Sequence, residues 1–434
     1  MDNKAIISLI IFVCTYFFIA VEKTPKVYVS IAGVLLLVLL RIFDFEEIHN
    51  FVDWDTISFL FGIFIVVKII EISGFFNYLS LKVIKKFNYD PLKIFFFFPI
   101  LSWFLSGFVD SITVLTFLAP LTYTLCRLIK IDPIPLIVAE VCLANVGGSG
   151  TLMGDPPNVI LGSMFNLGFT NFFIHNYIIS FFSGLAALSV FYINQKNKLI
   201  KIRETIDKRI FEKIVPEEAI EDRLLAKYGI FGLLSIVFLL IFRDIIKKIF
   251  PLSIGICSLL PSFFILFQKG SNVKLKNLLR EIDIETLLFF ISLFIIVGSL
   301  EKTGLIKILS SSLNKQFENG FKMTTLLFWF SVSTSAFIDN VPEAMSIGYL
   351  IRHIYHQIPY HFTILIWSSS LGLDMGGNFT PIGASANVVA YGFLESQGVK
   401  IGWKRWIKLM FLPNLFAVSV SYIFVILKFM IGFY

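Results

Sequence analysis

The apolar residues of this chain come in long blocks, not at the spacing of a single helix face or of a strand. The first three blocks are Ala5 to Val21, Val27 to Phe43 and Thr56 to Ile72. Each is close to the roughly 17–25 residues that a helix needs to cross the hydrocarbon core of a bilayer. The first block lacks a basic leading segment and a small-residue cleavage site, which favours a span over a signal peptide. The pattern predicts an all-α polytopic membrane protein.

Polar and glycine positions repeat along the chain at one offset. Asp53 and Thr56 open one apolar block as Asp283 and Thr286 open another, 230 positions later. An offset of 229 then relates a second set of positions: Asp110 with Asp339, Gly147-Gly148 with Gly376-Gly377, Thr151 with Thr380, Gly154 with Gly383, and Asn158 with Asn387. Apolar blocks resemble one another by chance, but polar positions in separate segments do not share an offset by chance. The sequence therefore predicts an internal duplication.

The duplication divides the chain into two predicted repeats joined by a linker. The first repeat, 1–193, contains scaffold spans within 4–72, a long block at 92–130, a second block at 134–166 and a last span at 170–193. The second repeat, 224–434, contains the same elements in order: spans within 225–300, then 322–358, 362–394 and 406–428. Residues 194–223 are charged and polar, which is typical of a solvated linker.

Blocks 92–130 and 322–358 carry polar residues at their midpoints. Their two pieces are short for full crossings, and a bare turn cannot face lipid, so we expect re-entrant helical hairpins, with pairs of full spans as the alternative. Glycine-rich breaks interrupt 134–166 and 362–394, which we expect to be broken helices. The predicted fold has about ten full transmembrane helices, two of them broken, plus two re-entrant hairpins.

The distribution of charge sets the predicted orientation. If the hairpins are re-entrant, each repeat crosses the membrane five times. Because five is an odd number, the second repeat starts on the opposite side of the membrane, so the repeats are inverted. Most of the 37 Lys and Arg residues then fall on one face, including the linker. Basic loops face the cytoplasm, so we expect an inner-membrane protein with both termini outside and a cytoplasmic linker.

Composition narrows the candidate functions. Only 15% of residues are charged, and the mean hydropathy is +0.82, so the net charge of +7 reflects loop bias and not nucleic-acid binding. Four scattered cysteines show neither metal-ligand spacing nor a disulfide framework, and no cofactor is expected. The chain contains no Walker motif to supply direct ATP drive. The expected partners are the lipid bilayer and a small ion or anion.

Breaks in membrane helices are costly unless they line a cavity or bind something, and in transporters with inverted repeats they form the substrate and ion site. Ionisable residues at such depth are functional candidates. Here these are Asp110, Asp155, Asp339 and Asp374, with helix capping, or for Asp374 a paired carboxylate, as the alternative. The two hairpin-tip residues, Asp110 and Asp339, are candidate sodium ligands. The candidate backbone groups belong to Gly147, Gly148, Gly154, Gly376, Gly377 and Gly383.

Residues 145–158, 337–342 and 376–388 together resemble the ion transporter superfamily, in its arsenite-permease and melanosomal P-protein branch. This branch is related to the sodium-coupled dicarboxylate and citrate carriers. The resemblance covers about residues 30 to 425. It implies a scaffold domain and a mobile transport domain, often in a homodimer, working by an elevator-like movement. It also implies that hairpin tips and helix breaks carry the site, with matching positions at Asp110, Ser111, Asp155, Asn158, Asp339, Asn340, Ser385 and Asn387.

The tips depart from those of the dicarboxylate carriers, which have Ser-Asn-Thr there. This chain has Asp110-Ser111 and Asp339-Asn340, and acidic tips argue against a dicarboxylate substrate. We therefore expect an ion-coupled secondary transporter, not an enzyme, with sodium or a proton as the coupling ion. Sodium/proton antiport and arsenite-type efflux are alternatives within this class. A passive channel and an intramembrane aspartyl protease with an aspartate dyad are alternatives from other classes.

Overall fold

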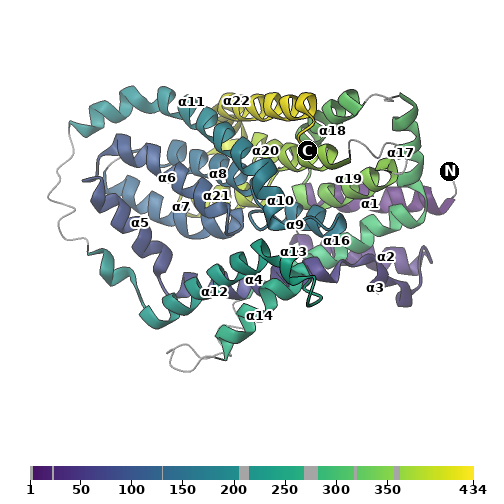
Figure 1. Ribbon diagram of the computed structural model, residues 1–434. Coiled ribbons are helices and arrows are strands. Elements are labelled where there is room, and N and C mark those ends of the chain that lie inside the picture. Colours follow the sequence, from purple (N-terminus) through teal and green to yellow (C-terminus); the bar gives the residue numbers. More distant parts are fainter. Residues whose placement is uncertain are drawn as a thin grey trace.

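The computed structural model describes residues 3–21, 24–129, 131–204, 215–267, 282–316, 320–355 and 362–434, and all regular elements in these ranges are helical. Figure 1 shows long helices packed side by side in two groups. Part of the expected linker is helical, because α11 (Ile178–Arg203) continues well past residue 193. Residues 205–214 of that linker lie outside the described residues.

One group, which we call the scaffold helices, forms the lower and right part of Figure 1. Within it α4 packs against α12 and α14, and α2 packs against α1 and α16. Aspartates start two of these helices: Asp53 accepts from the amides of Asp55 and Thr56, and Asp283 accepts from the amide of Thr286. The scaffold helices are α1 (Asn3–Val21), α2 (Lys26–Leu39), α4 (Trp54–Ile72), α12 (Arg223–Ile241), α14 (Ile254–Leu266) and α16 (Ile284–Lys302).

The second group, which we call the broken-helix group, contains the two interrupted blocks of each half. Its eight helices are α6 (Pro91–Ser106), α7 (Ser111–Leu128), α8 (Ile134–Gly148), α9 (Pro156–Met164), α18 (Gly320–Ser335), α19 (Asn340–Tyr355), α20 (Phe362–Gly376) and α21 (Ser385–Ser396). Helices α11 and α22 (Gly402–Ile431) pack against each other and cover this group along the top of Figure 1.

Shorter elements join the long helices, both within and between the two groups. Helices α5 (Phe75–Lys86) and α17 (Leu305–Gln316) follow α4 and α16 at sharp turns. Both turns contain a glycine with positive φ, 75° at Gly74 and 73° at Gly304, a conformation that glycine adopts without strain. The remaining short elements are η1 (Phe45–Glu47), α3 (Ile48–Phe51), α10 (Phe169–Phe172), η2 (Phe173–Tyr177), η4 (Pro216–Ala219), α13 (Arg243–Ile246) and η6 (Gly377–Phe379).

Among the described residues, five helical segments are long and apolar enough to cross a membrane, or six if the bent pair α4 and α5 is one span. These five are Ser111–Leu128, Phe169–Arg203, Arg223–Ile241, Ile284–Lys302 and Gly402–Ile431. Other expected spans are shorter apolar helices, among them α2 and α14. Helix α7, expected to be one arm of a hairpin, is itself 18 residues long and passes the length test.

Equivalent contacts recur in the two halves at the offset found in the sequence. Thr151 donates to the Gly107 carbonyl, 2.5 Å away, and Thr380 donates to the Ala336 carbonyl. The glycines of the breaks match as well. A Cβ on Gly154 would lie 2.5 Å from the Ser106 oxygen, and one on Gly383 would lie 2.6 Å from the Ser335 oxygen. Glycine is therefore required where each hairpin meets its helix break.

Candidate functional site

Each helix break is closed by an asparagine that follows it. Asn158 donates to the carbonyls of Gly148 and Thr151, at 3.0 and 2.9 Å. Asn387 donates to the carbonyls of Gly377 and Thr380, both at 2.8 Å. A side-chain amide thus supplies donors that the unwound backbone lacks, which is how irregular backbone survives in an apolar interior. Both asparagines are fully buried.

The tip of each hairpin rests against the break. Helices α6 and α7 both pack along α8. Ser102 of α6 donates to the Glu140 carbonyl of α8 at 2.8 Å, and Thr122 of α7 donates to Glu140 Oε1 at 2.6 Å. Their turn at 107–110 meets the break next to Thr151. The turn between α18 and α19 meets the second break in the same way through Thr380. Both tips therefore reach the interior of the broken-helix group.

The two halves meet at one buried polar cluster. Asp155 starts α9 but makes no capping hydrogen bond to it. Its oxygens instead accept from Ser111, 3.2 Å away, and from the Asn340 amide, 2.9 Å away. The same amide nitrogen lies 3.3 Å from Asp374 Oδ1, so one donor bridges the two carboxyl groups. Helix capping does not account for Asp155, whose carboxylate faces the other half of the chain.

A second set of amides crosses between the halves on the other side of the breaks. Asn145 donates to Asn378 Oδ1 at 2.8 Å and to Asn387 Oδ1 at 2.9 Å. Ser370 of α20 donates to Asn158 Oδ1 at 2.6 Å. Helix α8 thus supports the second break and α20 supports the first, so the two broken helices cross each other at their interruptions.

Asn176 joins this crossing from a π-helical turn, η2, in the long segment leading to α11. Its amide donates to Ser370 at 3.1 Å and to the Ser149 carbonyl at 3.4 Å. Single π-turns are rare and are frequent at functional sites, since the extra residue re-aims a side chain. Here the turn brings a fully buried amide to the first break.

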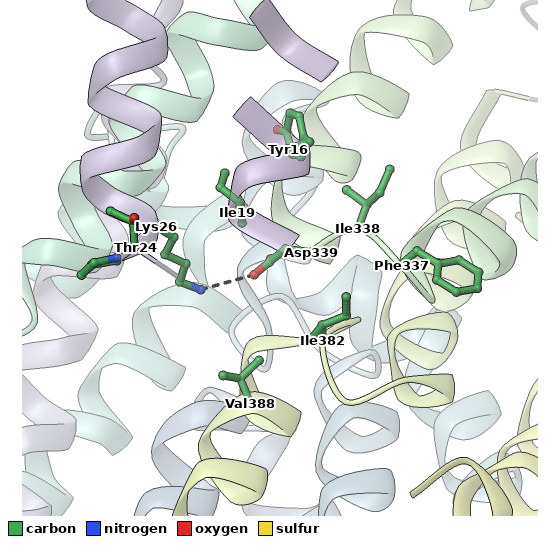
Figure 2. A pocket seen from close by; sticks show the side chains of 10 residues that line it. Tyr16, Ile19, Thr24, Lys26, Phe337, Ile338, Asp339, Ile382 and Val388 are labelled. Carbon is green, nitrogen blue, oxygen red and sulfur yellow. Dashed lines mark hydrogen bonds and ion pairs between the residues drawn. The ribbon is translucent and has the colours of Figure 1, made fainter. Parts of the chain in front are cut away.

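The second hairpin tip contacts the scaffold helices through an ion pair. Lys26 Nζ lies 3.3 Å from Asp339 Oδ2 and 2.6 Å from Ser385 Oγ, and Ser385 donates to Asp339 Oδ2 at 2.8 Å. Figure 2 shows Lys26 reaching from the start of α2 towards Asp339, with Tyr16 and Ile19 of α1 beside the tip. Tyr16, Ile19, Lys26 and Asp339 line a cavity of about 400 Å³.

The first hairpin tip lies beside a different cavity. Asp110 caps α7, because its two oxygens accept from the amide and the hydroxyl of Thr113 at 2.9 and 2.7 Å. It lines a cavity of about 190 Å³ together with Lys68 and Glu71 of α4 and Asp283 of α16. Asp110 and Asp339 hold equivalent positions in the sequence but have different partners.

Both tips rest against the same end of the scaffold helices. Lys26 at the start of α2 lies 4.9 Å from the ring of Phe289 near the start of α16. At the far end of α16, Lys302 bonds at 2.5 Å to Glu47 of η1, the element that follows α2, so α2 and α16 run in the same direction. A small cavity of about 10 Å³ between the groups is lined by residues from both, including Lys26, Thr286, Ser111, Asp155, Asn340 and Ser385.

Several buried acceptors at the crossing have no hydrogen-bond partner within the described part of the chain. They are Asp374 Oδ2, Asn145 Oδ1, Asn176 Oδ1 and, on α8, Glu140 Oε2. Buried polar atoms are normally satisfied, so unpaired acceptors indicate a place for a proton, a cation or water. No group of three or more His, Cys, Asp or Glu residues is placed to bind a metal in the ranges that the structure describes.

Some residues of this cluster carry little signal in the sequence. Lys26 follows Pro25 at a helix start, where a basic residue is ordinary. Asn145 stands out in the sequence only as the counterpart of Asp374, and Asn176 lies in an apolar block for which the sequence predicts no break. Asn378 lies inside the second break and Ser370 in the helix before it, but neither pattern indicates a partner in the first half. The offset of 229 between the halves could have drawn attention to Asn145 as a site residue, because it relates Asn145 to a charged position.

Comparison with known proteins decides the family. A model of the citrate transporter family (CitMHS) matches residues 16–372, which is most of the chain. The chain belongs to this family. The expected relationship to the ion transporter superfamily is thereby confirmed, and the chain is a secondary transporter and not an enzyme. The family leaves no place for the aspartyl protease alternative, and it makes this a multi-pass membrane protein with a small-solute substrate.

Relatives extend over nearly the whole chain. An uncharacterized transporter of Mycobacterium tuberculosis is 30% identical over 417 residues, covering 92% of this chain and 93% of its own. The 46 kDa membrane protein of Mycobacterium leprae is 29% identical, covering 98% and 99%. The human P protein is 24% identical over 95% of this chain and 58% of its own length.

Two solved structures share the fold. The chain matches the efflux pump MtrF of Neisseria gonorrhoeae with a TM-score of 0.57 and 13% identity, covering 98% of this chain and 94% of that one. It matches the YdaH transporter of Alcanivorax borkumensis with the same TM-score and 12% identity, covering 99% of each. At these identities the likeness concerns the fold alone.

Proposed function

We propose that this member of the citrate transporter family is an ion-coupled secondary transporter of a small ion or anion across the cytoplasmic membrane. The observation that carries the proposal is the buried group formed by Asp155, Asn340 and Asp374, which joins both halves of the chain at two crossed helix breaks. A carboxyl pair at such depth needs a proton or a cation to balance its charge. Asp374 Oδ2, buried without a donor, is the atom best placed to receive one.

The proposed architecture is two inverted repeats, each with five crossings and one re-entrant hairpin. Recurrent contacts at one offset support the repeats. Although α7 is long enough to span, its first residue, Ser111, contacts Asp155 in the interior of the broken-helix group. A helix that starts at the centre and returns beside its partner is the arm of a hairpin.

The arrangement of the two groups supports an elevator-like movement, in which the broken-helix group slides along the scaffold helices. Both tips lie at the end of the scaffold from which α5 continues, and α5 carries Lys82, Lys85 and Lys86. A basic flank faces the cytoplasm. We therefore propose that the structure represents the inward-facing position, with sodium or protons bound near the tips during the movement.

The test is transport by the purified full-length protein in sealed proteoliposomes. Labelled citrate, arsenite and sodium are each offered as substrate under an imposed sodium or proton gradient. The proposal predicts flux of at least one probe that depends on a counter-gradient and is abolished in Asp155→Asn and Asp374→Asn. Flux that ignores every counter-gradient would instead indicate a passive channel.

Sodium/proton antiport is a second candidate because of the charges at the crossing. The residues lining the small central cavity include Asp155 as the carboxylate and Lys26 as the cation, and Lys26 is paired to Asp339. Such a lining suits a cation at least as well as an anion. Sodium flux driven by a pH gradient, with no anion present, would favour antiport over anion transport.

A further inference from the structure

Lys26 links the two groups of helices at the second hairpin tip. It belongs to the scaffold helix α2, whereas Asp339 and Ser385 belong to the broken-helix group. The lysine side chain is 39% exposed and the aspartate only 9%, so the ammonium enters a largely buried acceptor site from its open side. Within that site it contacts one carboxylate oxygen and one hydroxyl oxygen, and both would also be ligands for a small monovalent cation.

We infer that Lys26 is a tethered cation that takes the place of the coupling cation at Asp339 and Ser385 when the broken-helix group lies at the cytoplasmic end of the scaffold. The inference rests on the proposed function, and it assigns the release step to one residue. On arrival at this end the ammonium displaces the coupling cation, which leaves through the adjoining cavity of about 400 Å³.

The charges around Asp339 explain why another cation is needed when the pair is broken. Tyr16 of α1 lines the cavity beside Asp339 and, together with Glu343 of α19, lines a second cavity. Glu343 is buried and is bonded to the Thr334 hydroxyl. Among the described residues that line the cavity at this tip, Lys26 is the basic one. When the tip moves away from α2, Asp339 loses its cation, and an unpaired buried charge is strongly unfavourable. Binding of sodium or a proton removes that cost.

The two tips differ in a way that places this exchange at the second one. Asp110 uses both carboxylate oxygens for the amide and hydroxyl of Thr113 on its own helix. Asp339 gives only Oδ1 to its own helix, at 3.2 Å from the Val341 amide, and leaves Oδ2 to Lys26 and Ser385. Only the second tip thus offers an oxygen that alternates between a scaffold cation and a mobile one.

The test is a thermal-shift titration of the purified full-length protein. NaCl is titrated against choline chloride at constant ionic strength, and pH is titrated in a separate series. The variants are Lys26→Gln, Lys26→Arg and, as a matched control, Lys302→Gln, which removes a lysine from the ion pair with Glu47 at the far end of α16. A bound cation raises the melting temperature by mass action, so the midpoint of the titration reports its affinity.

The inference predicts that Lys26→Gln tightens cation binding by about tenfold, because a tethered competitor acts at a millimolar or higher effective concentration. For sodium the midpoint falls about tenfold, and for protons it moves up by about one pH unit. Lys26→Arg and Lys302→Gln keep the wild-type midpoint, and Asp339→Asn loses the response. An unchanged or weakened affinity in Lys26→Gln overturns the inference alone. A wild-type protein that responds to neither sodium nor pH overturns the proposed ion coupling as well.

Discussion

The side-chain amide of Asn340, at the tip of the second hairpin, lies 2.9 Å from Asp155 at the break of the first half. This contact spans 185 residues of sequence and makes the site a joint product of the two halves. Neither half contains a complete site, since the tip of the second hairpin donates to the aspartate at the break of the first half.

Removal of that amide provides the first prediction. Asn340→Ala takes away the amide that donates to both Asp155 and Asp374. We expect gradient-driven flux in proteoliposomes to fall at least tenfold, because the carboxyl pair loses the donor that orients it. Asn77→Ala, an exposed position on α5, should transport like the wild type. Wild-type flux in Asn340→Ala would show that this contact is not needed for transport.

The asparagines that close the breaks should matter for stability. Asn158→Ala and Asn387→Ala each leave two buried carbonyls without a side-chain donor. Unsatisfied buried groups cost about 1–3 kcal/mol each, so both variants should unfold at lower temperature and lose transport. The measurement is the melting temperature in detergent alongside flux. Similar losses in the two variants are expected because the contacts are equivalent, and a loss in only one would contradict that equivalence.

Glycine is required at the points where a hairpin meets a break. Gly154→Ala and Gly383→Ala would put a Cβ 2.5 and 2.6 Å from the oxygens of Ser106 and Ser335. We expect low yields of folded protein for both, judged by gel filtration. Gly392→Ala in α21 is the matched control, because its Cβ meets nothing within 4 Å and alanine favours helix by up to about 1 kcal/mol. Normal yields of both break variants would show that the backbone at Gly154 and Gly383 does not approach the oxygens of Ser106 and Ser335 this closely.

The far end of the scaffold should respond to acid. The hydrogen bond from Lys302, followed by that from the Asp44 amide, lowers the pKa of Glu47. A carboxylate with a lowered folded-state pKa adds stability above its unfolded pKa and loses it as pH falls through the folded value. The melting temperatures of the wild type and Glu47→Gln should therefore differ near neutral pH and converge in acid. A difference that persists unchanged in acid would show that charge is not the cause.

Sequence patterns predict where the helix breaks and hairpin tips lie, but they do not predict which distant residues contact them. Glycine, aspartate and asparagine at a common offset mark both breaks and both tips, since such residues survive in an apolar block only for a reason. The all-helical fold and the family follow from them. The same pattern predicts equal roles for Asp110 and Asp339, but Asp110 caps its own helix while Asp339 pairs with Lys26. That difference depends on which scaffold helix lies opposite, and the local sequence of neither tip specifies it.

The movement of the broken-helix group along the scaffold is the central claim, and a distance between the two groups tests it most directly. Spin labels are placed at Phe337, 63% exposed at the second tip, and at Leu39, 75% exposed at the far end of α2, in a background without the native cysteines. A second pair, Leu39 with Ile249, lies within the scaffold. As sodium, pH and substrate are varied, the first distance should shorten by several Å in a second population, about one helical turn or more, while the second stays fixed. A single unchanging distance for the tip pair under all conditions that support flux would contradict the account.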